Sequence, residues 1–361
     1  MRRLLLIIPT LLGIMVVNFV FVQFLPGGPV EQIITQLESS QSTNLISLGG
    51  DGNDAGQSNS SNKTNGNSAY KGSRGLPEDF IKELEQQFGF DKTPLERFIL
   101  MMKKYLLFDF GESYFRSISV VDLVLEKLPV SISLGLWSTL IAYLISIPLG
   151  IKKATNEGSK LDTYTSTIII MAYAIPGFLF AIMLLVLFAG GSFWQIFPMR
   201  GLTSEDWNQL GLVGKTLDYL WHICLPVLAS TIGSFATLTL LTKNSFLDEI
   251  KKQYVITAKA KGLSNFRVLY GHVFRNAMLI IISGFPGLFI SVFFGGSLII
   301  ETVFSLDGLG RLGFEAALSR DYPVMFGTLY FFALLGLLIG LLSDLTYMWI
   351  DPRIDFESRK L

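Results

Sequence analysis

Six long runs of apolar residues alternate with polar segments along the chain. Each run holds about 20 mainly apolar residues, which is the length that an α-helix needs to cross the hydrocarbon core of a bilayer. The predicted spans are Leu4–Leu25, Pro129–Ile151, Thr165–Gly190, Tyr219–Thr242, Ala277–Ile300 and Val324–Ile350. The pattern therefore predicts an all-α membrane protein with six membrane-spanning helices.

The spacing of these runs divides the chain into three parts. Residues 1–28 form the first part, which we expect to be an uncleaved anchor. Arg2 and Arg3 precede its apolar run as in a secretory signal, but the run is longer than the apolar region of a signal peptide and no small-residue cleavage pattern follows it. Residues 29–128 form an insert between the first two spans, and residues 129–361 carry the other five spans.

Positive charges in the short connecting segments predict the orientation of the spans, because Lys and Arg resist translocation. One alternating set of segments, which comprises both termini, 152–164 and 243–276, carries 15 Lys and Arg residues. The other two short loops, 191–218 and 301–323, carry two each. We therefore expect both termini to be cytoplasmic and the insert to lie outside.

The insert has two parts of different composition. Within residues 39–75, 22 of 37 residues are Gly, Ser or Asn, which bury too little apolar surface to offset chain entropy, so a disordered loop is predicted. Helix signals return in residues 76–128, where Pro77 suits a first helical position and Thr93 begins a capping box. We expect a small helical cap there, with a third short helix starting at Ser119.

The composition excludes several classes of function. Only 16% of the residues are charged and the mean hydropathy is +0.48, against about 25% charged residues in ordinary soluble domains. Lys plus Arg equals Asp plus Glu at 29 each, so there is no basic surplus to neutralise nucleic acid. The single cysteine, Cys224, excludes an intrachain disulfide and a zinc site built from cysteines, and we expect no metal site.

Two short matches to catalytic motifs lack their context. Gly214-Lys215-Thr216 resembles the end of a phosphate-binding loop, but Gln209 stands where the leading glycine is required. Asp109-Phe110-Gly111 spells the metal-binding tripeptide of kinases, but neither a kinase glycine-rich loop nor an H-R-D motif accompanies it. We therefore expect the chain not to be an enzyme and to have no catalytic residues and no cofactor of its own.

The loop 243–276 is long enough for two helices around a bend. Small residues at its centre permit close backbone approach, and two apolar side chains three residues apart provide contacts for a partner. This pattern fits a short helix that docks into a groove of another protein. The candidate docking residues are Thr257, Ala258, Lys259, Ala260, Lys261, Gly262, Leu263 and Phe266. An amphipathic segment lying on anionic lipid fits equally well, because Lys259, Lys261 and Arg267 are basic.

The same loop resembles the cytoplasmic coupling loop of ABC-importer permeases, whose signature is E-A-A-x-x-x-G. Ile256, Thr257 and Ala258 stand at the opening positions and Gly262 at the glycine, and the Glu of the signature is absent. That departure is usual in the oligopeptide and dipeptide branch. Blocks similar to that branch are Arg2–Leu4, Leu25–Gly27, Phe108–Gly111, Leu128–Ser131, Glu301–Gly310, Arg320–Val324 and Asp351–Arg353. The extended insert and Thr242–Glu249 make the Yej-type permeases of peptide and microcin C uptake the most similar group.

The resemblance implies a fold, a place in the cell and a set of partners. The fold is that of type I ABC-importer permeases, in the bacterial inner membrane and surrounded by membrane lipid. The partners are a second homologous permease that forms a heterodimer, two cytoplasmic ATPase domains that bind the ATP, and a periplasmic peptide-binding protein. The cargo would be peptides, including peptide-nucleotides similar to microcin C.

Ionisable residues at the membrane boundary are further candidates, because charges in a span are costly. We interpret Glu301, at the outer end of the fifth span, as a gate contact rather than a buried charge, and Arg320 and Asp321 as the other gate candidates. Pro148, Pro176 and Pro286 are expected to interrupt spans two, three and five. Substrate-binding residues are not predicted.

Two other classes of membrane protein compete with the importer hypothesis. A secondary transporter requires titratable or ion-binding residues near the middle of the bilayer and often has internal repeats, and the sequence has neither. A sensor with an external ligand domain requires a sizeable cytoplasmic module. The tail after Ile350 is short, which favours the importer hypothesis.

Overall fold

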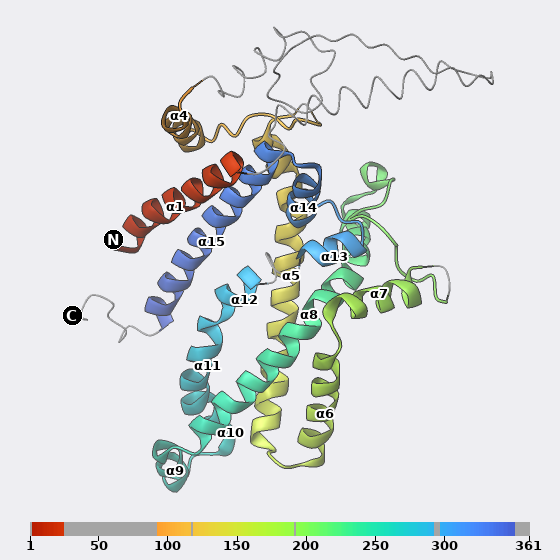
Figure 1. Cartoon of the computed structure of the whole chain (residues 1–361). Coiled ribbons are helices and arrows are strands. Elements are labelled where there is room, and N and C mark those ends of the chain that lie inside the picture. Colours follow the sequence, from red (N-terminus) through yellow and green to blue (C-terminus); the bar gives the residue numbers. More distant parts are fainter. Residues whose placement is uncertain (1, 25–91, 117, 191–192, 292–296, 351–361) are drawn as a thin grey trace, which may run out of the picture.

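The structure is a computed structural model, and every regular element in its described residues is a helix (Figure 1). The described residues are 2–24, 92–116, 118–190, 193–291 and 297–350. These ranges contain no strand, since Glu112 and Ser119 form only an isolated antiparallel bridge. The predicted all-α class is therefore confirmed. The predicted loop 39–75 and the helix expected from Pro77 lie outside the described residues.

Four helical segments of the described residues are long and apolar enough to cross a membrane: Val120–Thr155, Leu212–Ile250, Asn265–Ile290 and Tyr322–Thr346. A fifth candidate is the pair α6 (Lys160–Ala174) and α7 (Gly177–Phe188), which is bent by 95°. Helix α1 (Arg2–Phe24) contributes a shorter apolar stretch, Ile8–Phe21. Each of the six predicted runs thus begins in a helix.

Two of the six runs are not single straight helices. The third run is broken at Pro176, which precedes α7 and lies at the bend. The fifth run is divided among α11 (Phe274–Ser283), α12 (Phe285–Ser291) and α13 (Ser297–Val303). Pro286 lies in α12, whereas Pro148 lies inside the continuous helix α5, so the predicted interruption there is wrong. Apolar length alone does not show where a chain turns.

Helices α5 (Val120–Thr155) and α8 (Leu212–Ile250) form the long central pair (Figure 1). The Ser119 side chain caps α5 by accepting a hydrogen bond from the Asp122 backbone NH, so the predicted short helix is the first part of this long one. The two helices approach closely at Gly150, where an added Cβ would lie 2.5 Å from Thr242 Cβ. A side chain at this position would push the pair apart.

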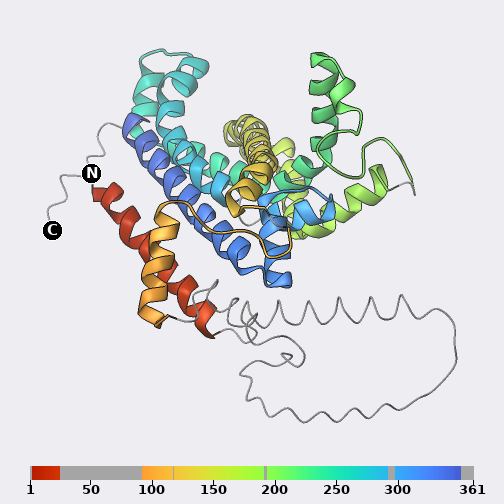
Figure 2. The same ribbon diagram turned by 90° about the horizontal axis from the view of Figure 1, so that it is seen from above.

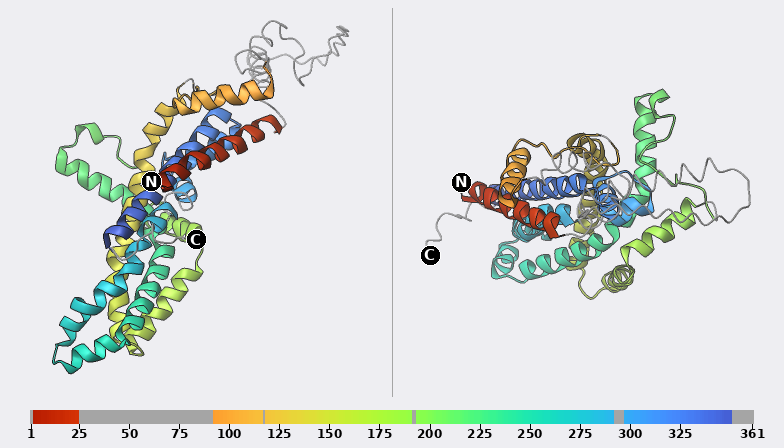
Figure 3. Two further views of the ribbon diagram at one scale, coloured as in Figure 1. Left: turned by 90° about the vertical axis from the view of Figure 1, so that its left-hand side faces the viewer. Right: turned by 45° about the horizontal axis from the view of Figure 1, so that its top comes forward.

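The remaining elements are the long helix α15 (Tyr322–Ile350) and several short elements toward the two ends of the molecule. The short elements are α4 (Pro94–Leu106), η1 (Trp207–Gln209), α9 (Gln253–Ala260), α10 (Asn265–Val268), the π-helical turn η2 (Leu269–Val273) and α14 (Leu309–Ser319). Helices α4 and α14 lie at one end of the molecule and α9 and α10 at the other, as Figure 3 also shows. We call these the α4 end and the α9 end.

Three clusters of buried apolar side chains hold the helices together. The first joins α1, α4, α14, α15 and the start of α5 at the α4 end. The second joins the far ends of α5 and α8 to α9, α10 and α11 at the α9 end. The third lies between α5, α7, α8 and α13.

Thr93 caps α4 through the predicted capping box. The Thr93 Oγ1 atom accepts a hydrogen bond from the Glu96 backbone NH, and Glu96 Oε2 accepts one from the Thr93 backbone NH.

Candidate functional site

The loop 243–276 folds as the expected pair of short helices around a bend. Helix α8 continues to Ile250, and α9 and α10 follow as a hairpin at the tip of the molecule (Figure 1). The Tyr254 hydroxyl donates a 2.7 Å hydrogen bond to Glu249 Oε2, and Lys252 pairs with the same carboxylate. These contacts attach the start of α9 to the end of α8.

Gly262 forms the bend between α9 and α10. Its φ is +84°, in the left-handed region that a Cβ disfavours. The Gly262 backbone NH donates to the Lys259 carbonyl at 2.9 Å, and the Leu263 NH donates to the Ala258 carbonyl at 3.3 Å, which is the Schellman pattern of a helix C-terminus. A Cβ built on Gly262 meets no atom within 4 Å, so the glycine is required by backbone conformation rather than by space within this chain.

The hairpin has an inner and an outer face. Val255, Ala258 and Val268 are buried in the cluster at the α9 end. Phe266 is 70% exposed and packs its ring 4.7 Å from that of Tyr270, which is also exposed. Ile256 is exposed on the same hairpin. The outer face therefore presents apolar side chains at the tip of the molecule, where a partner can reach them.

Six of the eight predicted docking residues are exposed. They are Thr257, Lys259, Ala260, Lys261, Gly262 and Phe266. Ala258 is buried, and Leu263 is half-buried against the same cluster, as the residue after a Schellman glycine often is. Leu263 is thus less accessible to a partner than Phe266. The exposed side chains of Ile256 and Tyr270 were not among the predicted docking residues, and the four-residue spacing of Phe266 and Tyr270 was a usable signal.

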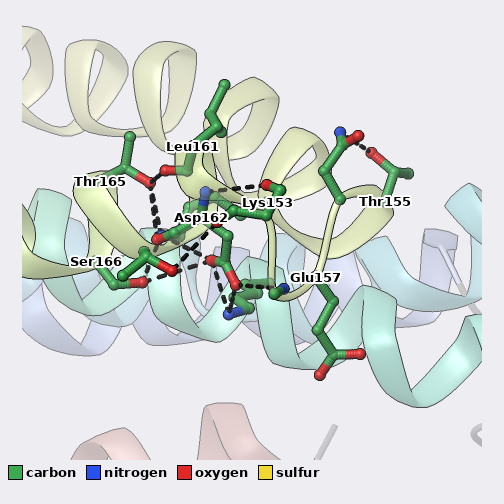
Figure 4. A network of polar contacts seen from close by, with 12 residues as sticks. Lys153, Thr155, Glu157, Leu161, Asp162, Thr165 and Ser166 are labelled. Atoms are coloured by element: carbon green, nitrogen blue, oxygen red, sulfur yellow. Dashed lines mark hydrogen bonds and ion pairs between the residues drawn. The ribbon is translucent and has the colours of Figure 1, made fainter.

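An ionic network that was not predicted lies where α5, α6 and α8 meet (Figure 4). The Asp162 carboxylate accepts hydrogen bonds from Lys243 Nζ to both of its oxygens, each at 2.8 Å, and Lys153 Nζ lies 3.1 Å from Oδ1. Lys153 is fully buried and also donates to the hydroxyls of Thr165 and Ser166. One carboxylate thus joins α5, α6 and α8.

The local sequence explains how Asp162 reaches this position. The Ser159 side chain caps α6 and accepts from the Asp162 backbone NH, which places Asp162 in the first turn of that helix. The Ser-x-x-Asp spacing was the signal that could have found the helix start. The two lysines come from helices far apart in sequence, so their convergence depends on the packing of α5 against α8.

Glu301 is a buried carboxylate and not an exposed gate contact. It is 0% exposed, and its Oε1 accepts a 2.7 Å hydrogen bond from the Ser131 hydroxyl of α5. Its Oε2 accepts from the Arg311 backbone NH at 2.8 Å, in the first turn of α14. The expectation that Glu301 is not a buried charge is therefore wrong, and the NH groups at the start of α14 help to stabilise the carboxylate there. Its role as a gate contact stays a prediction.

The other two gate candidates occupy a corner between helices. Asp321 is buried between α14 and α15, where it accepts from the Ser113 hydroxyl at 2.5 Å and from the Tyr114 backbone NH at 3.3 Å. Burial raises the pKa of the Asp321 carboxyl, and these hydrogen bonds oppose the rise. Arg320 ends α14 in the left-handed conformation and is exposed. Asp321 therefore attaches the end of the insert to the last span.

Comparisons with known proteins agree with the resemblance seen in the sequence. The family described as "Binding-protein-dependent transport system inner membrane component" matches residues 146–356. The "Peptidoglycan transport system permease protein YejB" of Agrobacterium fabrum is 60% identical over 359 residues, covering 99% of this chain and 98% of the relative. The "Inner membrane ABC transporter permease protein YejB" of Escherichia coli O157:H7 is 57% identical over 358 residues, with the same coverage.

More distant relatives and a solved structure agree. The "Oligopeptide transport system permease protein AppB" of Bacillus subtilis is 31% identical over 359 residues, covering 98% of each chain. A chain of the MetNI methionine ABC transporter in an inward-facing conformation shares the fold, with a TM-score of 0.51 and 16% identity over 64% of this chain and 97% of that one. The resemblance drawn from the sequence is thereby confirmed, and the chain belongs to the family of inner membrane components of binding-protein-dependent transport systems, the permease subunits of ABC importers.

Proposed function

We propose that this permease moves peptides inward and that the α9–α10 hairpin is the surface on which a partner ATPase acts. The observation that carries the proposal is the outer face of the hairpin, where Ile256, Phe266 and Tyr270 are exposed. The inner face of the hairpin is held by the buried cluster at the α9 end. An apolar tip on a rigid helix pair fits a groove in another protein. The ATP would be bound and hydrolysed by two partner subunits, and this chain would hydrolyse nothing.

The contacts behind the hairpin supply a route for the movement. A push on α9 reaches α8 through Tyr254 and Glu249, and it reaches α5 and α6 through the carboxylate of Asp162. These are short, charged contacts between rigid helices, which shift together rather than bend. ATP-driven closure of the partner subunits would thus tilt several helices at once, between inward-open and outward-open states.

Three observations support the orientation, partners and cargo. The α9 end carries the loop with seven of the Lys and Arg residues that predict the cytoplasmic side, so both termini would be cytoplasmic. Many apolar side chains are exposed on the spans, which leaves surface for lipid and for a second, homologous permease in a heterodimer. Relatives named for peptidoglycan and oligopeptide transport favour peptide cargo and a periplasmic peptide-binding protein. Peptide-nucleotides similar to microcin C remain a narrower prediction.

The test is uptake by the reconstituted complex in sealed vesicles. We expect labelled oligopeptides to enter only with ATP on the α9 side and binding protein on the opposite side, and uptake to persist when a protonophore collapses the proton gradient. Uptake by this chain alone, lost on adding the protonophore, would instead indicate a secondary transporter. Transport of sugars or metal ions without peptides would keep the mechanism and overturn the cargo.

A further inference from the structure

Helix α4 and the turn after it expose apolar side chains although they belong to the insert and not to a span. Leu95, Ile99 and Leu106 are exposed at spacings of four and seven residues, which place them on one stripe of the helix. Leu107, directly after the helix, is 80% exposed, and Phe108 follows it with a positive φ of 58°. Such a continuous apolar surface is unfavourable in water.

The inner face of the same segment packs on two helices of the membrane domain. Figure 2 shows α4 crossing α1, and the rings of Phe98 and Phe19 lie 5.3 Å apart at that crossing. Tyr105 packs 5.8 Å from Tyr330 of α15, and Phe108 packs 6.1 Å from Phe331. The segment is therefore fixed beside helices that cross the bilayer.

The position of these contacts along α15 gives their depth. Helix α15 has 29 residues and is about 43 Å long, close to the full thickness of a bilayer with its headgroups. Tyr330 lies eight residues from Tyr322, the first residue of α15, which is about 12 Å along the helix. The interfacial layer on each side is about 5 to 7 Å thick. The contact between Tyr105 and Tyr330 therefore lies at or below the boundary between headgroups and acyl chains.

Helix α1, which α4 crosses, also exposes apolar side chains. Val17 and Phe21 lie four residues apart on one face of α1 and are exposed. As the first predicted span, α1 would bring these side chains against acyl chains. Lys103 and Lys104 are exposed in the last turn of α4, where they match the charge of anionic headgroups.

We propose that residues 95–108 form an interfacial anchor that inserts its apolar stripe into the leaflet at the α4 end, with anionic phospholipid as its partner. The inference does not depend on the cargo or on ATPase coupling. It places residues 95–108 on the membrane surface rather than free above it, and holds the corner formed by Ser113 and Asp321 at a fixed height.

Spin-label accessibility in lipid nanodiscs tests the proposal. The full-length chain, with its only cysteine replaced by Cys224→Ser, carries single cysteines at Leu95, Ile99, Leu106 or Leu107 for labelling. Lys104→Cys is the matched polar control on the same helix, because it lies on a different face from the stripe, and Leu342→Cys on α15 is the lipid-exposed reference. We expect collisions with oxygen to exceed collisions with a water-soluble nickel chelate at the four apolar positions and at Leu342, and the reverse at Lys104.

Two results would overturn the proposal. Excess collisions with the nickel chelate at the apolar positions would place the stripe in water. Low accessibility to both reagents would show that protein covers it, so a protein partner and not lipid would be its occupant. A second measurement addresses the headgroups: adding phosphatidylglycerol to phosphatidylcholine nanodiscs should deepen the label at Leu107, and Lys103→Gln with Lys104→Gln should abolish that shift. No change with lipid charge would exclude anionic lipid as the partner.

Discussion

Substitution of Gly262 separates two reasons for a glycine in the coupling hairpin. The sequence suggested that Gly262 permits close approach to a partner, whereas the structure places it at a φ of +84° with no atom of this chain within 4 Å of an added Cβ. If backbone conformation is the reason, asparagine, which tolerates the left-handed region, should replace glycine better than alanine does. If close approach is the reason, the smaller alanine should be the better replacement.

The size of the effect follows from the backbone. Forcing a residue with a Cβ into the left-handed region costs about 1 to 2 kcal/mol, which is about a 5- to 30-fold shift in the population of the formed bend. A β-branched residue is expected to cost more. The predicted order of transport activity is therefore glycine, asparagine, alanine and then valine. Membrane insertion should be equal in all four proteins, since the bend lies outside the spans.

The assay is ATP-dependent peptide uptake, together with the amount of ATPase subunit that copurifies with each variant. Alanine above asparagine would refute the conformational explanation and support close approach. Full transport by Gly262→Val, with ATPase subunits still bound, would refute the assignment of this hairpin to coupling.

Three further predictions concern the helices that support the hairpin and the corner at the opposite end. Asp162→Asn should destabilise the protein by about 3 kcal/mol or more, because it leaves the buried Lys153 and the half-buried Lys243 without a carboxylate. Glu157→Gln, which removes an exposed 3.7 Å ion pair, should cost under about 1 kcal/mol; thermal unfolding in detergent measures both, and equal effects would refute the role of the network. Gly150→Val should separate α5 from α8 and abolish assembly of the transporter complex, measured by size-exclusion chromatography, whereas Gly233→Ala, whose added Cβ meets no atom within 4 Å, should leave assembly unchanged. An assembled Gly150→Val protein would contradict the close crossing of α5 and α8. Burial raises the pKa of Asp321, so the folded state binds this proton more readily than the unfolded state; its contribution to stability is complete below the unfolded pKa and declines as the pH rises through the folded pKa. Asp321→Asn should remove that decline in unfolding scans run upward from about pH 4, and an unchanged pH profile would show that another group is responsible.

The spans, their order and the coupling loop could be predicted from apolar length and from helix signals. The capping box at Thr93 and the helix start at Ser119 are local features, and both occur as expected. The sequence could not predict that the helix bends sharply at Pro176, because a proline can lie at a kink or inside a continuous helix. Pro148 lies inside the continuous helix α5.

The polar contacts required the tertiary structure. Asp162 meets Lys243 across 81 residues, and Ser113 meets Asp321 across 208, so no local pattern relates them. The burial of Glu301 was not foreseen because the cost of burying its charge is offset in part by the Ser131 hydroxyl, which is 170 residues away in sequence, and in part by the start of α14. Which side of each short helix faces inward likewise depended on the packing of the hairpin on α5 and α8.

The central claim is that the exposed tip of the hairpin contacts an ATPase subunit, and photo-crosslinking from Phe266 tests it most directly. Phe266 is 70% exposed at the tip of this chain, so a photoreactive phenylalanine analogue at position 266 should crosslink to the ATPase subunit in the complete complex in membranes. The same analogue at Ile280, an exposed position on the span α11, is the control and should crosslink elsewhere. The yield from position 266 should change when ATP binds. Crosslinks from position 266 to lipid alone, with no ATPase adduct in any nucleotide state, would contradict the account and show that the hairpin is a membrane-surface segment.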